Sequence, residues 1–169
     1  MFIWQHIELP TDEVSEITNR ALEVVDQMTA SNHFYQGLDL GITKFMGLDL
    51  FKIVLIQSLG RALGNIHIDY RAFDNNNTLA INFPLINCEN SVTEFWESDH
   101  YDPNLRYTSS NTPYIGFTRD NCRKISEYNL IKPVIFNTSV PHSVRNYSVA
   151  PRLAISLRLT HDPWHLVNQ

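Results

Sequence analysis

The clearest hydrophobic pattern in the chain is a strict alternation close to its C-terminal end. Side chains of a β-strand point alternately to its two faces. One face of this segment is apolar, with Leu153, Ile155, Leu157 and Leu159. The opposite face is small or charged, with Arg152, Ala154, Ser156 and Arg158. The pattern therefore predicts a strand with one face for a hydrophobic core and another face for a different purpose.

Residues 79–85 repeat this design. Leu79, Ile81, Phe83 and Leu85 alternate with Ala80, Asn82 and Pro84. Pro84 predicts that the strand lies near an edge or is about to end. We expect the small polar faces of the two strands to line an interior cavity, which makes Asn82 and Ser156 candidates for binding a small acid. Satisfied polar groups in the core would explain these two residues equally well.

The remaining pattern predicts one helix and several further strands. Apolar residues at helical spacing indicate an amphipathic helix over residues 12–29, with Thr11 as its cap, and this helix is the obvious cover for the apolar strand faces. Residues 31–50 show no clear period and indicate turns, with a short helix as an alternative. Strands are expected at residues 1–8 (on an edge), 51–59, 92–96 and 134–138; another is expected to begin at Ile66 and another to end at His142.

Two further segments contain candidate functional residues. Residues 97–121 are rich in turn formers, tyrosines and arginines, which predicts a flap at the mouth of a binding site. Its candidate substrate contacts are Tyr101, Arg106, Tyr107 and Arg119. The C-terminal tail contains His161 and His165, but Pro163 lies between them and argues against a helical metal-binding pair.

The composition fits one globular domain. The 169 residues divide into helical support (1–50), a β-core (51–159) and a tail (160–169). The net charge of −5 makes nucleic acid an unlikely partner, and no signal peptide or membrane span is apparent. Cys88 and Cys122 lack metal-binding spacing and are expected to be free thiols, in keeping with a cytoplasmic location.

The chemistry is concentrated in three residues. His67 and Asp69 are two positions apart on the strand predicted to begin at Ile66, so both side chains point to the same face. With His142 they provide two imidazoles and one carboxylate, the facial triad that leaves three positions open on a non-haem Fe(II) ion. His100 and Asp102 form a rival H-x-D pair, but theirs is a turn-like context before Pro103, with a shorter interval before His142.

The order H-x-D, then a distant His, then Arg152 at the head of the next strand resembles the Fe(II)/2-oxoglutarate-dependent oxygenase family over roughly residues 51–159. The resemblance implies a mainly β fold, a double-stranded β-helix (jelly roll, cupin-like), with the N-terminal helix packed on one sheet. It implies that His67, Asp69 and His142 bind iron and act as the catalytic centre. It also implies that Arg152 pairs with the distal carboxylate of 2-oxoglutarate, the co-substrate consumed with O₂.

The activity that the resemblance implies is hydroxylation of an amino-acid side chain, a peptide or a small metabolite. The carboxylate ligand Asp69 favours hydroxylation, or a demethylation that follows from it, over halogenation. The run R-x-A-x-S-x-R is only loosely similar to the strand of the nucleic-acid demethylases. Two alternatives stay open: a cupin-like metalloenzyme that does not use 2-oxoglutarate, and a non-catalytic jelly-roll binding module. The sequence leaves the substrate, the oligomeric state and the role of Arg158 undetermined.

Overall fold

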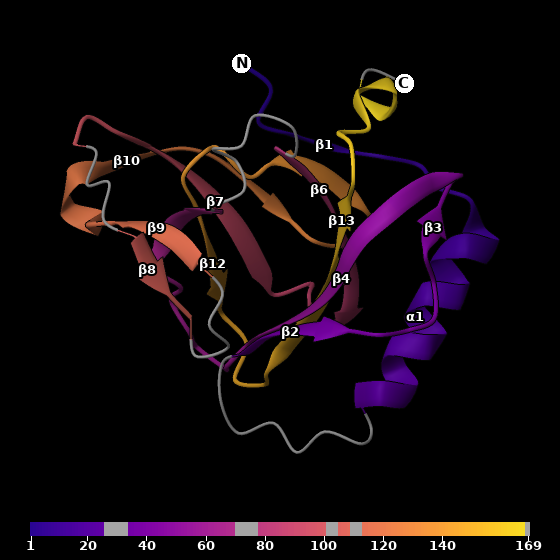
Figure 1. Ribbon diagram of the computed structural model, residues 1–169. Helices are drawn as coiled ribbons and strands as arrows, with labels where there is room; N and C mark the ends of the chain where they lie inside the picture. Colours follow the sequence, from indigo (N-terminus) through magenta and orange to yellow (C-terminus); the bar gives the residue numbers. More distant parts are fainter. Residues whose placement is uncertain (26–33, 70–77, 101–104, 109–112, 168–169) are drawn as a thin grey trace.

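The computed structural model describes residues 1–25, 34–69, 78–100, 105–108 and 113–167 (Figure 1). Within these ranges the chain is mainly β-strand, with α1 (Thr11–Val25) as its α-helix. Short 3₁₀ turns lie at η2 (Arg119–Asn121) and η3 (Trp164–Leu166). The first strands are β1 (Trp4–His6), β2 (Phe34–Leu38), β3 (Lys44–Phe45), β4 (Leu48–Ser58), β5 (Ile66–Asp69), β6 (Leu79–Ile86) and β7 (Ser91–Ser98). They are followed by β8 (Leu105–Tyr107), β9 (Pro113–Phe117), β10 (Cys122–Asn129), β11 (Val134–Asn137), β12 (His142–Asn146) and β13 (Arg152–Leu159).

The described strands form two antiparallel sheets. The larger sheet has the order β1-β11-β6-β13-β4-β2, and β3 pairs with β4 beside this path. The smaller sheet has the order β10-β7-β12-β5-β9-β8. Strands that are distant in the sequence are neighbours in both sheets, as in a jelly roll. The structure therefore confirms the predicted fold class.

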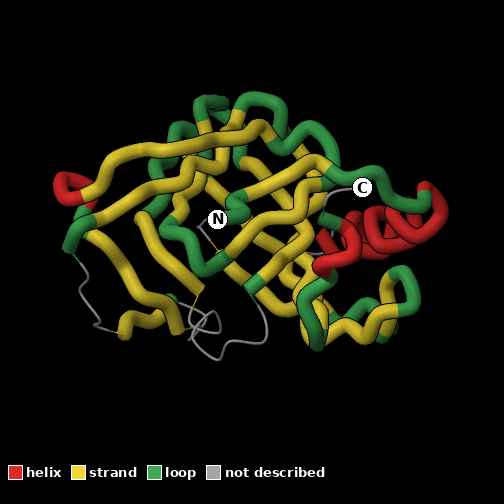
Figure 2. Tube along the Cα trace, turned by 90° about the horizontal axis from the view of Figure 1, so that it is seen from above, coloured by secondary structure: helices red, strands yellow, loops and turns green. Residues whose placement is uncertain are grey.

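The larger sheet has an apolar outer face that α1 covers. Ile17 and Ala21 of the helix pack against Ile155 and Leu157 of β13 in one hydrophobic core. All four side chains are fully buried or nearly so, with at most 2% of their surface exposed. Figures 1 and 2 show α1 lying to one side of the strands, which leaves the opposite face of this sheet turned towards the smaller sheet. The expected packing of an N-terminal helix on one sheet is confirmed.

The space between the sheets contains a second, smaller apolar cluster. It includes Phe95, Phe136 and Tyr128, whose rings are in tilted and edge-on contact, and also Val134. Ala80 and Ala154 of the larger sheet belong to the same cluster. These small side chains leave room between the sheets for polar groups of β6 and β13.

Some predicted boundaries were wrong. Residues 34–50, expected to be turns or a short helix, contain β2, β3 and the start of β4. The helix begins at Thr11, so Thr11 is a helical residue rather than the cap, and the end expected at residues 26–29 lies outside the described residues. His142 begins a strand instead of ending one, because the residues before it form a turn and Pro141 interrupts the ladder.

Two other expectations about strands held. The first strand, β1, pairs only with β11 and therefore lies on the edge of the larger sheet, as predicted. Pro84 lies in β6 beyond Asn82, where pairing with β11 has already ended and only β13 continues alongside. A proline, which has no N–H to donate, is tolerated at such a position.

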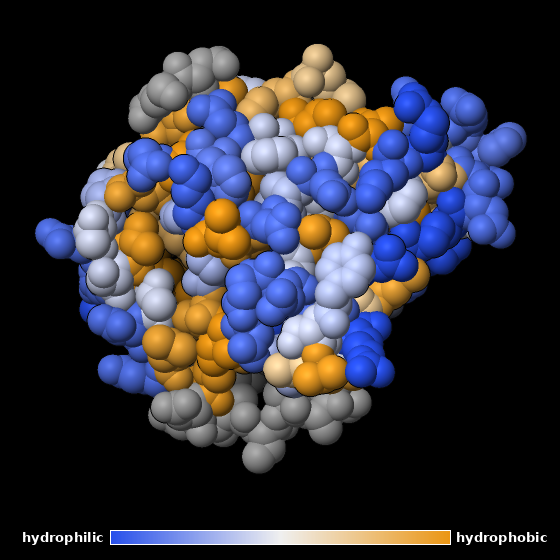
Figure 3. Space-filling model, turned by 180° about the vertical axis from the view of Figure 1, so that it is seen from behind, coloured by the Kyte–Doolittle hydropathy of each residue, from blue (hydrophilic) through white to orange (hydrophobic). Residues whose placement is uncertain are grey.

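On the side shown in Figure 3, hydrophilic side chains are interspersed with hydrophobic groups. None of the helices within the described residues is long and apolar enough to cross a membrane.

Candidate metal centre and inner chamber

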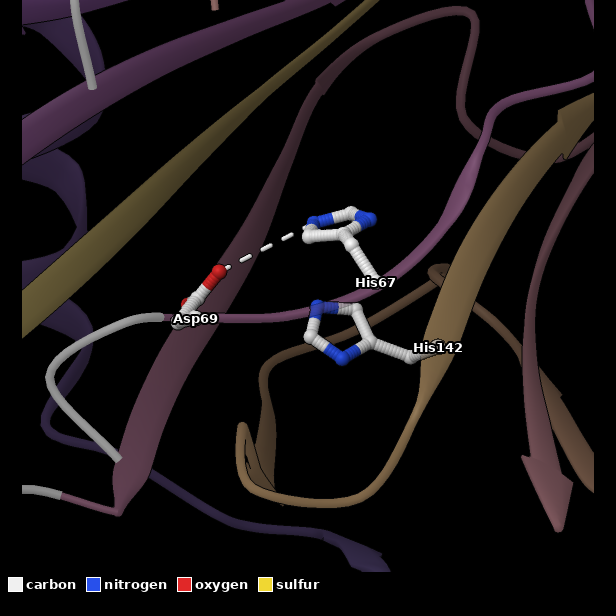
Figure 4. A group of neighbouring side chains, drawn as sticks. All are labelled: His67, Asp69 and His142. Carbon is white, nitrogen blue, oxygen red and sulfur yellow. Dashed lines mark ion pairs between the residues drawn. The ribbon is translucent and has the colours of Figure 1, made fainter. Parts of the chain in front are cut away.

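The metal-ligand candidates meet on two neighbouring strands of the smaller sheet. His67 and Asp69 lie on β5, and His142 begins β12, which is the next strand in the sheet. His142 and His67 are directly paired in the ladder, so their side chains leave the sheet on the same side. Figure 4 shows both imidazole rings and the carboxylate turned towards one small region.

The distances suit a single metal ion. One ligand atom from each of His67, Asp69 and His142 can be chosen so that all three lie within 4.8 Å of one another. The imidazole Nε2 of His67 is 3.7 Å from Oδ1 of Asp69, and the centres of the two imidazole rings are 4.5 Å apart. Ligand atoms bound about 2 Å from one ion would have separations of this order.

Backbone carbonyls orient both rings. Nδ1 of His67 lies 2.9 Å from the carbonyl oxygen of Asn65, and Nδ1 of His142 lies 2.9 Å from that of Val140. A carbonyl can only accept, so each Nδ1 carries the proton and donates it. Each Nε2 is then left with a lone pair, which is the arrangement that metal-binding histidines require.

The site's electrostatics favour the ligand forms of these groups. Burial lowers the pKa of His142 to about 4, with a further contribution from His67, so this imidazole is neutral at pH 7. Burial pushes the pKa of Asp69 upwards, but Arg158 and the two imidazoles outweigh that effect and hold the pKa below its usual value. A neutral imidazole and an ionised carboxylate are both ready to bind a cation without first losing a proton.

Arg158 reaches across from the larger sheet to the metal-ligand candidate Asp69. Its Nη1 lies 2.7 Å from Oδ2 of Asp69, which makes a charge-assisted contact. The side chains of Arg158 and Asp69 are 16% and 22% exposed, so the pair is largely shielded from water. The sequence left the role of Arg158 open, and the structure gives it this partner.

Arg152 lies on the same face of β13 but has no such partner. Only 1% of its surface is exposed, and its Nε and Nη1 atoms have no hydrogen-bond partner among the described residues. It is paired with Ser58 of β4, a residue that lines the cavity. A buried guanidinium without an anion is energetically costly.

Other polar atoms around Arg152 are also buried without a partner within the described part of the chain. They are Oδ1 of Asn82, Oγ of Ser156, Oγ1 of Thr93 and the hydroxyl of Tyr128. Ser156 and Asn82 are directly paired between β13 and β6, and Thr93 and Tyr128 are paired between β7 and β10. We call the space among these side chains and Arg152 the inner chamber.

The pKa values of two neighbouring groups reflect their burial in and beside the inner chamber. Burial raises the pKa of Tyr128, an effect that Thr93, Arg152 and Asn82 partly offset. Burial also raises the pKa of the Cys88 thiol, which lies near Arg152. Cys88 donates to the carbonyl oxygen of Leu153 and is a free cysteine, as expected.

A cavity of about 560 Å³ joins the triad to the molecular surface. Its lining includes all three metal-ligand candidates and Arg158, together with Asn82 and Thr93 of the inner chamber. Much of the remaining lining is uncharged and includes Leu63, Val144, Tyr107, Pro113 and Tyr114.

The predicted flap is more ordered than a plain loop. It contains β8 and β9, which pair with each other beside β5, and Tyr107 and Thr108 line the cavity. Arg119 does not line the cavity; it lies over the Trp96 ring, 3.7 Å from Glu94, and donates to the carbonyl of Gly64. Arg106 is on the exposed strand β8, whereas Tyr101 lies outside the described residues.

The other histidines that were considered as metal ligands do not lie in the triad. His100 is exposed, and Asp102 lies outside the described residues. In the tail, His161 contacts the hydroxyl of Thr160, and Pro163 separates it from the 3₁₀ turn that contains His165. In the described part of the chain, the group of residues able to hold a metal is His67, Asp69 and His142.

Sequence reasoning missed Thr93 and Tyr128. Tyr128 was missed because a register shift in β10, between Lys124 and Ser126, hides which of its residues face inwards. For Thr93 a signal was available, because alternation along β7 puts Thr93 and Glu94 on opposite faces of the strand.

No family model and no curated protein matches the sequence, whereas several solved structures are similar in fold. The epimerase SnoN in complex with Fe³⁺, α-ketoglutarate and nogalamycin RO is 15% identical, with a TM-score of 0.56 over 95% of this chain and 79% of that one. A prolyl-4-hydroxylase from Pseudomonas putida is 14% identical, with a TM-score of 0.51 over 96% and 94%. The α-ketoglutarate-dependent carbocyclase SnoK is 14% identical, with a TM-score of 0.52 over 95% and 80%.

α-Ketoglutarate is another name for 2-oxoglutarate, so these neighbours include enzymes of the type that the sequence resembles. At such low identity, the likeness establishes the fold. The chain thus shares the jelly-roll fold of Fe/2-oxoglutarate-dependent enzymes and brings together a His-Asp-His triad, with no subfamily assigned.

Proposed function

We propose that this protein is an Fe(II)- and 2-oxoglutarate-dependent oxygenase that hydroxylates a small metabolite, an amino-acid side chain or a peptide. The observation that carries the proposal is Arg152, a buried arginine with two unpartnered nitrogens, on the sheet face opposite an assembled triad. A metal alone would not explain Arg152, and an anion alone would not explain the triad. A dicarboxylic acid bound to both explains the two together.

The triad residues fit Fe(II). Nε2 of His67, Nε2 of His142 and Oδ1 of Asp69 would hold the ion and leave three of its six positions open. With Fe(II) bound, the reaction would be R–H + 2-oxoglutarate + O₂ → R–OH + succinate + CO₂. The protein's part is to hold the ion and both organic molecules in a fixed geometry and to exclude water.

The inner chamber fits the co-substrate. The planar guanidinium of Arg152 would pair with the distal carboxylate through two parallel hydrogen bonds. Ser156, Thr93 and Tyr128 carry hydroxyls that can donate to the same carboxylate. Each of these three hydroxyls would gain the partner that it lacks among the described residues.

The substrate would enter from the outer side of the cavity. Leu63, Val144, Tyr107, Pro113 and Tyr114 offer mainly apolar and aromatic surface beside the triad. Such a wall suits a compact organic substrate better than a phosphate backbone, which would need a row of cations. This supports a small molecule or a short peptide as the substrate, in keeping with the acidic net charge.

The two alternatives have less support. A cupin-like metalloenzyme without 2-oxoglutarate would leave Arg152 buried without an anion. A non-catalytic binding module would have no use for three ligands with correctly oriented lone pairs. Both alternatives therefore leave a costly feature of the interior unexplained.

Formation of succinate tests the proposal. Protein loaded with Fe(II) would be incubated with 2-oxoglutarate, O₂ and a panel of neutral metabolites, amino acids, short peptides and nucleosides, and succinate would be measured for each. We expect O₂-dependent succinate formation that at least one compound stimulates and that Asp69→Ala abolishes. Failure to form succinate under any of these conditions, by a protein that binds Fe(II) and 2-oxoglutarate, would contradict the proposed reaction.

A further inference from the structure

We propose that Arg158 is a positioning residue that directs the two oxygens of Asp69 to different tasks. Oδ1 would face the metal, and Oδ2 is paired with the Arg158 guanidinium. The inference rests on the proposed metal site and goes beyond it, because it assigns a role to a side chain that is neither a metal ligand nor the proposed partner of the distal carboxylate.

The two carboxylate oxygens of Asp69 have different partners. Oδ1 of Asp69 faces Nε2 of His67 at 3.7 Å, and Nε2 is the nitrogen that has its lone pair available. Oδ2 lies 2.7 Å from Nη1 of Arg158, so these two atoms form a close ion pair. One oxygen is therefore on the side of the ligands and the other is committed to the arginine.

The ion pair also joins the two sheets. Asp69 is the last residue of β5 in the smaller sheet, whereas Arg158 is near the end of β13 in the larger sheet. Backbone contacts hold Asp69 beside Tyr114 of β9 and Thr138, but they do not fix the rotation of its carboxylate. A partner fixed on the opposite sheet supplies the missing constraint, and the low exposure of both side chains limits competition from water.

Holding Oδ2 away from the ion has a chemical consequence. A carboxylate can bind a metal through one oxygen or through both, and the second mode would take one of the three positions that the co-substrate and O₂ need. Arg158 keeps Oδ2 occupied and thereby favours the mode with one oxygen. Residues that hold metal ligands in this way change metal affinity by about 10–100-fold when they are replaced.

The two arginines of β13 therefore have separate tasks on the same strand face. Arg158 contacts the metal ligand Asp69, whereas Arg152 lies in the inner chamber with two unpartnered nitrogens. Loss of Arg158 should weaken metal binding, and loss of Arg152 should weaken binding of the dicarboxylic acid. Variants of the two arginines should therefore differ in which ligand they bind more weakly.

The test uses Mn(II), which is stable in air and gives an electron paramagnetic resonance (EPR) spectrum. The full-length wild-type protein, Arg158→Gln and Arg158→Lys would each be titrated with Mn(II), without 2-oxoglutarate. We expect Mn(II) to bind about 10–100-fold more weakly to Arg158→Gln. Arg158→Lys should recover part of the loss, because an ammonium keeps the charge but not the fixed planar geometry.

The spectrum provides a readout that a loss of stability alone would not change. Bound Mn(II) in Arg158→Gln should give an altered zero-field splitting, since the carboxylate is free to bind through both oxygens. The matched control is Arg145→Gln on the outer face of β12, where the arginine lies over the Tyr147 ring; it should leave affinity and spectrum unchanged.

The outcomes separate this inference from the proposed function. If both Arg158 variants bind Mn(II) within about twofold of the wild type and give its spectrum, the positioning role is wrong and the metal site stands. If the wild type itself fails to bind Mn(II), the metal site and the inference fall together. If Arg158→Gln does not fold, Arg158→Lys decides: wild-type affinity and an unchanged spectrum in that variant overturn the inference.

Discussion

The two faces of β13 are both buried, but they differ in whether burial stabilises the fold. On the outer face, Ile155 and Leu157 are completely buried against α1 and the rest of the main core. On the inner face, Arg152 and Ser156 are as deeply buried, yet both have polar atoms without a hydrogen-bond partner among the described residues. One strand therefore has a face that stabilises the fold and a face whose burial costs free energy.

The difference is the reason why we assign the proposed function to the inner face. Burial of an apolar side chain contributes roughly 1.5–3 kcal/mol to folding, whereas an unpartnered polar group costs about 1–3 kcal/mol. The proposed co-substrate would offset several such costs in one chamber next to the triad. The predictions below compare these two faces.

The largest effect is expected at the metal ligands. Asp69→Ala or His142→Ala should reduce Mn(II) affinity by more than about a thousandfold, since a facial site that loses one of three ligands no longer holds the ion. The fold should survive, because the main core on the outer side of the larger sheet is untouched. Calorimetric titration with Mn(II) measures the affinity, and circular dichroism checks the fold.

His100→Ala is the matched control and should bind Mn(II) like the wild type. If instead His100→Ala lost the metal and His142→Ala kept it, the site would belong to the rival H-x-D pair.

The next effect contrasts neighbouring residues on the two faces. Ile155→Ala should lower the free energy of unfolding by roughly 2–5 kcal/mol, because it leaves a cavity in the main core. Ser156→Ala, one position along, should change it by less than about 1 kcal/mol or raise it, since the buried hydroxyl has no partner to lose. Urea unfolding of the ligand-free protein measures both. A loss of several kcal/mol in Ser156→Ala would remove the contrast.

The sequence predicted the parts of the fold that depend on local pattern. Alternation located β13 with its correct ends, and the spacing of His67 and Asp69 placed both on one side of β5. The sequence could not predict β2 and β3, because short strands on or beside a sheet edge have little pattern of their own and depend on β4 as a partner.

The candidate site was also predicted only in part. The metal-ligand candidates follow from the motif, but the partner of Arg158 depends on how two sheets face each other, which no local pattern contains. Tyr128 and Thr93 join the inner chamber from the opposite sheet, so their membership of the chamber also depends on how the sheets face each other. The position of His142 at the start of β12 depended on the turn before Pro141.

A moderate effect is expected from pH. Burial lowers the pKa of His142 from 6.5 to about 4 in the folded, metal-free protein. Between these values the unfolded chain binds a proton that the folded protein does not, so stability is lost as the pH falls from about 6.5 to about 4. The loss from this group should be roughly 2 kcal/mol between pH 7 and pH 5.

Urea unfolding of the metal-free protein at pH 7 and pH 5 measures this loss. His142→Gln should show a smaller loss by about that amount, because glutamine does not titrate. An identical pH dependence in the two proteins would show that His142 is not the group responsible.

The smallest effect is expected for single hydroxyls of the inner chamber. Ser156→Ala should weaken binding of 2-oxoglutarate to the Mn(II) form by about 2–10-fold, which corresponds to one hydrogen bond of 0.5–1.5 kcal/mol. Tyr128→Phe should have an effect of the same order. Both should bind Mn(II) normally, and calorimetric titration distinguishes the two steps. Unchanged affinity in both variants would place the co-substrate outside the inner chamber.

The central claim is that Arg152 is buried in order to bind the distal carboxylate of 2-oxoglutarate. Calorimetric titration of 2-oxoglutarate into the Mn(II) form, without O₂, tests it in the wild type, Arg152→Ala and Arg152→Lys. Loss of a buried charge-assisted pair costs roughly 2–5 kcal/mol, so Arg152→Ala should bind about 30-fold to several thousandfold more weakly, while Arg152→Lys recovers part of the loss. Wild-type affinity for 2-oxoglutarate in Arg152→Ala would contradict the claim.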